Sequence, residues 1–179
     1  MFFPSAPASL PLDRELLFNY HAAGFQVRGY GLAFSLSVFT PKGDSVTPEQ
    51  IRLVKSSFQK VIPISDTAAA LFYGRLFELD PSIRPLFKGD IKEQGRKLMD
   101  MLDTLVQGLD KLQTIVGAVQ KMGKSHVAYG VQSKHYDTVG IALLWTLEQG
   151  LGKDFTPETK QAWTETYKLV ADAMQDASR

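Results

Sequence analysis

Two of the three histidines in the chain, His126 and His135, lie nine residues apart in the stretch GKSHVAYGVQSKHYDTVG, residues 123–140. A histidine can ligate a metal ion or serve as an ordinary polar residue. Helical spacing puts His126 on the same face as Val119 and Met122, which points its side chain toward an apolar core. Taken alone, this position favours a buried histidine over a metal ligand. We expect His135 to lie in the solvated turn before the next helix, with no role in a site.

Two further polar side chains fall on apolar helix faces. Gln94 shares its face with Leu98, and Tyr73 shares its face with Leu76. Each of the two could be a core residue, because a buried amide or hydroxyl needs a hydrogen-bond partner to avoid a cost of about 1–3 kcal/mol. Three inward polar residues on three helices, with His126 as the third, are less easily explained as core residues.

A single imidazole does not make a zinc site, because zinc takes about four ligands. A heme macrocycle already supplies four nitrogens and needs only one imidazole from the protein. Tyr73 and Gln94 could then donate hydrogen bonds to a diatomic ligand on the opposite side of the heme. The three residues together therefore favour a heme site, with His126 as the iron ligand.

Composition excludes several other classes of protein. The 179 residues carry 20 Lys and Arg against 19 Asp and Glu, so the chain lacks the basic surplus that is usual in nucleic-acid-binding proteins. The absence of cysteine excludes a disulfide framework, a thiolate metal site and a thiol nucleophile. No apolar stretch reaches the ~18 residues of a membrane span, and the first residues lack the features of a signal peptide. We expect a cytoplasmic protein.

The elements that must position these residues change character near Thr47. Residues 1–46 are rich in proline and glycine and include a strand-like alternation over residues 32–38, so we expect an N-terminal extension there. From Thr47 onward, apolar residues recur at three-to-four spacing, which is typical of helices. We expect helices over about 47–62, 65–80, 91–109, 112–126, 136–151 and 156–174. The sequence therefore predicts an all-α domain over residues 47–179.

From Thr47 to about Ala177 the chain resembles a bacterial single-domain globin and is similar to the heme domain of flavohemoglobins. The resemblance rests on LFYGRLFELDPSIRPLF at 71–87, KEQGRKLM at 92–99, HVAYGVQSKHYDTVG at 126–140 and AWTETYKLVADAM at 162–174. It implies a globin fold, with helices packed around a pocket for heme b. The implied site residues are Tyr73 and Gln94 on the distal side, Phe87 and Leu98 against the heme, His126 on the iron and Tyr136 on the proximal side.

The resemblance also implies a function. A globin with a distal Tyr/Gln pair is expected to bind O2 tightly, and also NO and CO, which suits storage or sensing of O2 better than transport. The alternative is a nitric oxide dioxygenase that forms nitrate and takes its electrons from a separate reductase, since the chain ends at Arg179 without room for a reductase domain. A heme-free signalling module is less favoured, because the four residues that define the pocket are all present.

One position departs from the family pattern. Flavohemoglobins place a glutamate near the end of the last helix, coupled to the proximal histidine and to the tyrosine that matches Tyr136. The matching place here is Ser178, with Asp176 nearby. A carboxylate bonded to a metal-ligating histidine makes it a stronger electron donor. We therefore expect peroxidase-like activation to be weakened, and the sequence leaves open whether Asp176 or Ser178 replaces the glutamate.

Overall fold

The computed structural model describes residues 46–179, and every regular element in this range is helical. The predicted all-α domain is confirmed for these residues. The expected N-terminal extension, including the alternating stretch at 32–38 and His21, lies outside the described residues apart from Val46. No helix within residues 46–179 is long and apolar enough to cross a membrane.

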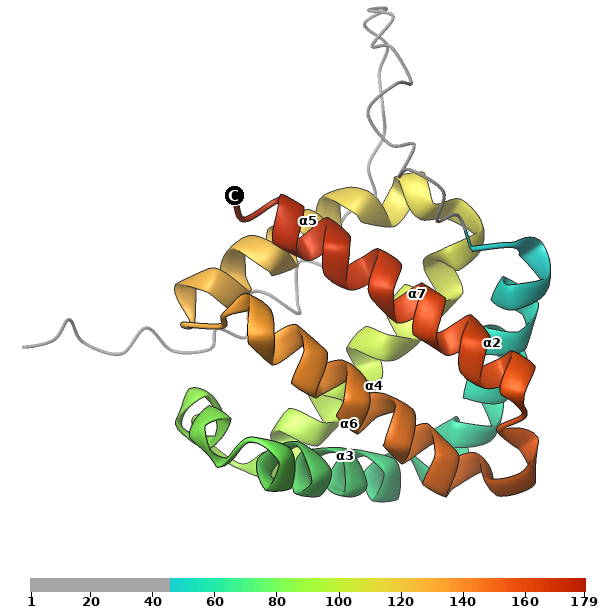
Figure 1. Cartoon of the computed structure of the whole chain (residues 1–179), viewed down its shortest axis with the longest axis horizontal. Helices are drawn as coiled ribbons and strands as arrows, with labels where there is room; N and C mark the ends of the chain where they lie inside the picture. The colour runs from blue at the N-terminus through green and yellow to red at the C-terminus, as the bar shows by residue number, and fades with distance from the viewer. Residues whose placement is uncertain (1–45) are drawn as a thin grey trace, which may run out of the picture. The chain divides into compact units, whose positions relative to one another are not determined.

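Six α-helices and four short 3₁₀ helices make up the domain (Figure 1). In chain order the elements are α2 (Pro48–Val61), η1 (Ile62–Ile64), α3 (Ser65–Leu79), η2 (Pro81–Leu86), α4 (Ile91–Gly108), η3 (Leu109–Lys111), α5 (Leu112–Ala128), α6 (Ser133–Leu151), η4 (Gly152–Asp154) and α7 (Pro157–Asp176). The six α-helices match the six predicted from periodicity. The 3₁₀ helices were not predicted, because runs of three to six residues carry too little periodicity.

Side-chain caps fix where the helices begin. The Thr47 hydroxyl accepts a hydrogen bond from the Gln50 backbone N–H, and the Gln50 side chain accepts one from the Thr47 N–H, so that two otherwise unpaired donors are satisfied. Thr156 caps α7 in a similar way, through the N–H of Thr159. Asp90 caps α4, the helix that carries Gln94.

The start of α6 differs from the sequence prediction. The helix begins at Ser133, three residues before the expected Tyr136, because the Gln132 backbone N–H donates to Nδ1 of His135 at 3.1 Å and closes a cap there. His135 does lie in the first turn of this helix and outside the site. However, it is only 7% exposed, so the expectation that it is solvated was wrong.

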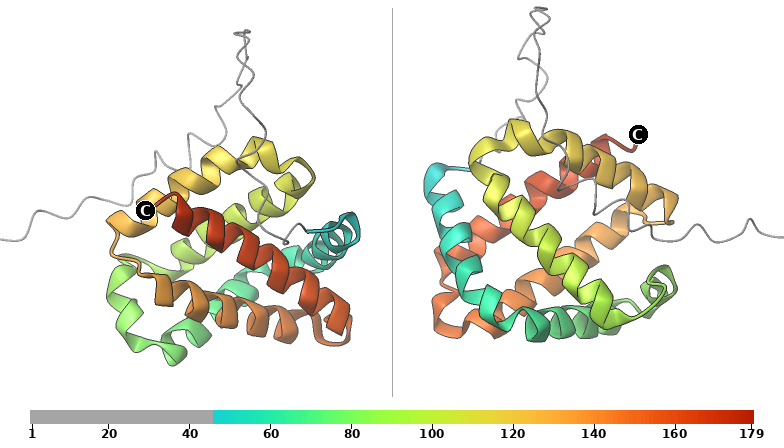
Figure 2. Two further views of the ribbon diagram at one scale, coloured as in Figure 1. Left: turned by 45° about the horizontal axis from the view of Figure 1, so that its top comes forward. Right: turned by 180° about the vertical axis from the view of Figure 1, so that it is seen from behind.

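The apolar interior falls into two clusters. The main cluster joins α2, α3, η2, α4, α6 and α7 around large buried side chains such as Phe58, Leu76 and Trp163. The second cluster is smaller and centres on Leu105, Val119, Tyr136, Ala171 and Met174. α5 contributes chiefly to this second cluster, because it packs mainly along the C-terminal half of α7 (Figure 2), and only its first residue, Leu112, packs on the main cluster.

Two glycines allow the helices that carry Gln94 and His126 to approach their neighbours closely. A Cβ on Gly95 of α4 would lie 2.9 Å from Cβ of Ala69 on α3, and a Cβ on Gly123 of α5 would lie 2.1 Å from the carbonyl oxygen of Met174 on α7. Both distances are below van der Waals contact, so no larger residue fits without a shift of the helices. The α3–α4 and α5–α7 crossings therefore depend on these glycines.

Candidate functional site

His126 lies in the last turn of α5 and is half-buried. Its Nδ1 is 2.8 Å from the carbonyl oxygen of Met122, one turn earlier. A carbonyl can only accept, so Nδ1 carries the proton and Nε2 keeps its lone pair. Burial lowers the pKa of His126, and the bond to Met122 opposes this only in part. The side chain is therefore a neutral imidazole with a basic Nε2, which is the form that ligates metals.

Tyr136 lies beside this imidazole. The rings of His126 and Tyr136 are stacked at 6.2 Å between centroids, with 29° between their planes. The Tyr136 hydroxyl is buried and has no hydrogen-bond partner among the described residues. Leaving a buried hydroxyl unpaired costs about 1–3 kcal/mol, so the position calls for a partner that residues 46–179 do not supply.

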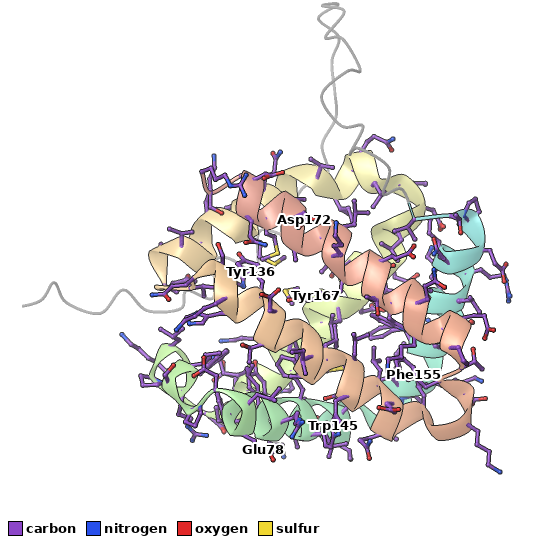
Figure 3. All side chains as sticks on the ribbon, viewed as in Figure 1. Glu78, Tyr136, Trp145, Phe155, Tyr167 and Asp172 are labelled. Atoms are coloured by element: carbon purple, nitrogen blue, oxygen red, sulfur yellow. The ribbon has the colours of Figure 1, made fainter. Side chains whose placement is uncertain are left out.

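Tyr167 of α7 fixes the backbone at Tyr136 through a hydrogen bond. Its hydroxyl donates to the Tyr136 backbone carbonyl at 2.6 Å, and Figure 3 shows the two tyrosines near each other between α7 and the first half of α6. Gly140 makes room for this contact, since a Cβ there would lie 2.7 Å from the Tyr167 ring. This role of Tyr167 could not be predicted from the sequence, because the two residues are 31 positions apart.

Neither candidate for the missing glutamate contacts His126. The Ser178 hydroxyl donates to the Met174 carbonyl at 2.6 Å, and Asp176 forms an exposed ion pair with Arg179 at 3.2 Å. The acceptor for Nδ1 is the backbone carbonyl of Met122, which the sequence reasoning missed although it lies four residues before His126 on the same helix. A neutral carbonyl donates less electron density through the imidazole than a carboxylate does.

Tyr73 and Gln94 meet where α3 packs against α4. Tyr73 is 5% exposed, and its hydroxyl donates to the Gln94 backbone carbonyl at 3.3 Å. Burial raises the pKa of Tyr73 to about 12, so the hydroxyl keeps its proton at physiological pH. Its ring packs edge-on against Phe87, with 5.3 Å between centroids.

The Gln94 side chain is buried, and its amide donates to the Lys88 carbonyl at 3.1 Å. Both distal donors are therefore bonded to backbone carbonyls in this structure. Leu98, one turn after Gln94, is half-buried and packs against the main core cluster. Tyr73 thus contacts both Gln94 and Phe87, and Leu98 packs on the same core cluster as Tyr73.

Several half-buried apolar side chains near these polar residues pack on the two core clusters. Phe87, Leu98 and Leu102 pack on the main cluster, whereas Met101, Met122 and Val131 pack on the second cluster. Within residues 46–179 there is no group of three or more His, Cys, Asp or Glu side chains that could hold a metal ion.

Comparison with known protein families shows to which family the chain belongs. The profile of the family described as Globin matches residues 70–174, which is more than half of the chain. The chain belongs to the globin family. The matched range contains every site residue predicted from the sequence, and the resemblance to the heme domain of flavohemoglobins is confirmed at the level of the family.

Individual relatives of this globin fall into two groups. It is 30% identical over 135 residues to a flavohemoprotein of Xylella fastidiosa, which covers 74% of this chain and 34% of that protein. The chain therefore spans about a third of the length of that relative. It is also 31% identical over 136 residues to a neuroglobin of Danio rerio, which covers 68% of this chain and 86% of the neuroglobin.

A solved structure confirms the globin fold. An engineered carbene transferase, built on a candidate nitric oxide dioxygenase from Rhodothermus marinus, superposes with a TM-score of 0.68 at 28% sequence identity. The match covers 75% of this chain and 94% of that protein.

The unpaired hydroxyl of Tyr136 yields a prediction about stability without cofactor. Tyr136→Phe should raise the free energy of unfolding of the heme-free globin by about 1 kcal/mol, because it removes a buried unsatisfied group. Tyr167→Phe, the matched control, should lower it by about 1 kcal/mol, since that hydroxyl donates to the Tyr136 carbonyl. Urea unfolding followed by circular dichroism measures both. A loss of stability in Tyr136→Phe as large as in Tyr167→Phe would show that the hydroxyl already has a partner.

Proposed function

We propose that this globin binds heme b through His126 and uses it to bind O2 with high affinity. The hydrogen bond between Nδ1 of His126 and the Met122 carbonyl carries the proposal. It fixes the tautomer and the orientation of the ring, and it leaves Nε2 as the one strong donor available to an iron atom. No hydrogen bond engages that nitrogen among the described residues.

The surroundings of His126 fit a heme on two further grounds. The buried Tyr136 hydroxyl has no hydrogen-bond partner within residues 46–179, so a bound group or a water beside it would satisfy it. Half-buried apolar side chains near these residues include Leu98, Met101 and Leu102 of α4, Met122 of α5, and Val131 just before α6. A flat, largely apolar cofactor would complete the burial of these side chains.

A bound heme would supply an iron atom that takes O2, CO or NO on the side opposite His126. The protein contributes hydrogen-bond donors there. Negative charge develops on bound O2, and donors fixed near it stabilise that charge. Tyr73 supplies a protonated hydroxyl, whose present bond to the Gln94 carbonyl is long at 3.3 Å, and Gln94 supplies an amide. Exchange of these backbone bonds for bonds to the ligand gives slow release of O2.

Similarity to oxygen- and nitric-oxide-related globins supports a second function, nitric oxide dioxygenation. The relative of known structure is built on a candidate nitric oxide dioxygenase, and a flavohemoprotein is among the related sequences. This activity needs one electron per turnover, supplied by a separate reductase. It uses the same His126, Tyr73 and Gln94, so residues alone do not separate it from simple O2 binding.

His126→Gly should abolish the five-coordinate ferrous spectrum of the heme-loaded protein, because it removes the iron ligand. Added imidazole should restore that spectrum by filling the vacated space. His135→Ala is the matched control: it loses the cap on α6 and should keep the spectrum of the parent protein. Visible absorption spectra of the ferrous and CO forms measure the outcome. An unchanged ferrous spectrum in His126→Gly would reject the assignment of the ligand.

Tyr73→Phe and Gln94→Ala should each speed the release of O2 by about tenfold or more, since a hydrogen bond to a charged acceptor contributes about 1.5–3 kcal/mol. Release of CO, which carries less charge, should change far less and serves as the control ligand. Between pH 6 and 9 the effect of Tyr73 should be constant, because its pKa of about 12 keeps the hydroxyl protonated. Stopped-flow displacement of O2 by CO measures the rate. Equal O2 release in parent and variants would rule out a role of the pair.

Sustained consumption of nitric oxide separates the two functions. An enzyme should consume many equivalents of NO per heme under O2 when NADPH and a reductase are added, with nitrate as the product. A binding protein should consume about one equivalent in a burst and then stop. An NO electrode and a nitrate assay measure both, and a burst alone would exclude the enzyme.

A further inference from the structure

The charge of the domain is distributed unevenly along the chain. The segments 84–97 and 121–134 carry eight Lys and Arg but two Asp and Glu, and the rest of residues 46–179 carry nine Lys and Arg but fourteen Asp and Glu. The whole chain has a formal charge of only +1. The near-zero net charge is therefore the sum of two positively charged segments and a negatively charged remainder.

The two positive segments lie on the same side of the molecule. In Figure 1 the segment 84–97, in η2 and the start of α4, and the segment 121–134, at the end of α5 and the start of α6, both lie toward the left. Contacts between them agree with this view, since a Cβ on Gly130 would lie 3.6 Å from Leu86. Lys134 also helps to lower the pKa of Asp80, next to η2. We call this region the basic rim.

His126 lies within the segment 121–134 and Gln94 within the segment 84–97, so the basic rim borders the proposed heme site. The heme carries two propionate carboxylates, which could neutralise two of the eight cations at most. A large positive excess remains at the surface. The exposed side chain of Val127, next to His126, adds an apolar spot at 52% exposure.

Most cations of the rim have no ion-pair partner among the described residues. Exposed and unpaired are Lys88, Lys92, Arg96, Lys121, Lys124 and Lys134. The exceptions are Lys97, which pairs with Glu93 at 3.2 Å, and Arg84, which stacks over Phe77.

Cations elsewhere in the described chain are more often neutralised. Arg52 pairs with Glu49 at 2.5 Å, and Lys60 pairs with Asp154 at 2.8 Å. Lys55 pairs with Asp110. Around the junction of α6 and α7, on the right in Figure 1, residues 148–160 carry three acidic and two basic side chains, so the charges there nearly balance. Unpaired cations therefore concentrate around the site.

We propose that the basic rim is the docking surface for an acidic redox protein that delivers one electron at a time to the heme. The proposal rests on heme binding as proposed above. In the step it serves, the partner loses one electron and the ferric heme gains it, so that the ferrous form is restored. A positive face of this kind raises the rate of encounter with an acidic partner by about 10- to 1000-fold and orients that partner toward the heme edge.

The pattern of charges favours a protein over a nucleic acid as the partner. Asp90 and Glu93 interrupt the cations of the rim, and such mixed charges with an exposed apolar spot are typical of a protein interface. A nucleic-acid surface would show a larger basic surplus in the whole domain.

The test is the rate at which reduced flavodoxin, a small acidic flavoprotein, reduces the ferric holoprotein in anaerobic stopped flow. Lys92→Glu with Lys134→Glu should lower the second-order rate by about tenfold at low salt, and the loss should shrink as salt screens the charges. Lys153→Glu with Lys160→Glu changes the net charge equally, in exposed positions around the junction of α6 and α7. This control should keep the rate within about twofold of the parent protein.

Equal loss in both double variants, or no loss in either, would overturn the docking surface. Reduced riboflavin, a small donor that carries at most one negative charge, should reduce all three holoproteins at nearly the same rate, which separates docking from the chemistry of the heme. Oxidised flavodoxin added to isotope-labelled protein should shift amide resonances in residues 84–97 and 121–134. Those shifts without heme uptake would reject the proposed function alone, and shifts elsewhere would reject the docking surface alone. The proposal would also be overturned if the protein bound phosphatidylserine vesicles but not flavodoxin, and if Lys92→Glu with Lys134→Glu abolished the binding to vesicles.

Discussion

The close approach of α5 to α7 at Gly123 determines where the imidazole of His126 can lie. Because glycine has no side chain, α5 can lie directly against the Met174 backbone at Gly123. This contact holds the last turn of α5 beside Tyr136 and Tyr167. The bond from His126 to the Met122 carbonyl then sets the tautomer within that turn. The position of His126 therefore depends first on a close backbone contact between two helices and only then on hydrogen bonds. The close approach of α3 and α4 at Gly95 likewise determines where Tyr73 and Gln94 lie.

Much of the fold could be predicted from sequence because local signals agreed with one another. The Thr47 and Thr156 caps and the three-to-four spacing of apolar residues gave the helices within a few residues. The site residues could be grouped because each was a polar residue on an apolar face. The burial of His135 could not be predicted in this way, because it depends on a cap closed by a side chain three residues into the helix.

Hydrogen-bond partners were the least predictable feature of the site. The sequence suggested that Tyr73 and Gln94 face a ligand, but it could not show that each is bonded to a backbone carbonyl. Such bonds satisfy buried donors within the protein. The same holds for His126, where the Met122 carbonyl accepts the hydrogen bond for which the resemblance implied a carboxylate. With His126 on a heme iron as proposed, this weaker acceptor would suit reversible binding better than cleavage of the O–O bond.

The division of the core into two clusters has a consequence for how the cofactor enters. α5 rests mainly on α7 and reaches the main cluster only through Leu112, so its detachment would disturb chiefly the second cluster. Local opening of a weakly anchored unit requires less free energy than global unfolding. With heme bound at His126 as proposed, separation of α5 from α7 would be enough to admit the cofactor, and its uptake would not require the whole domain to unfold.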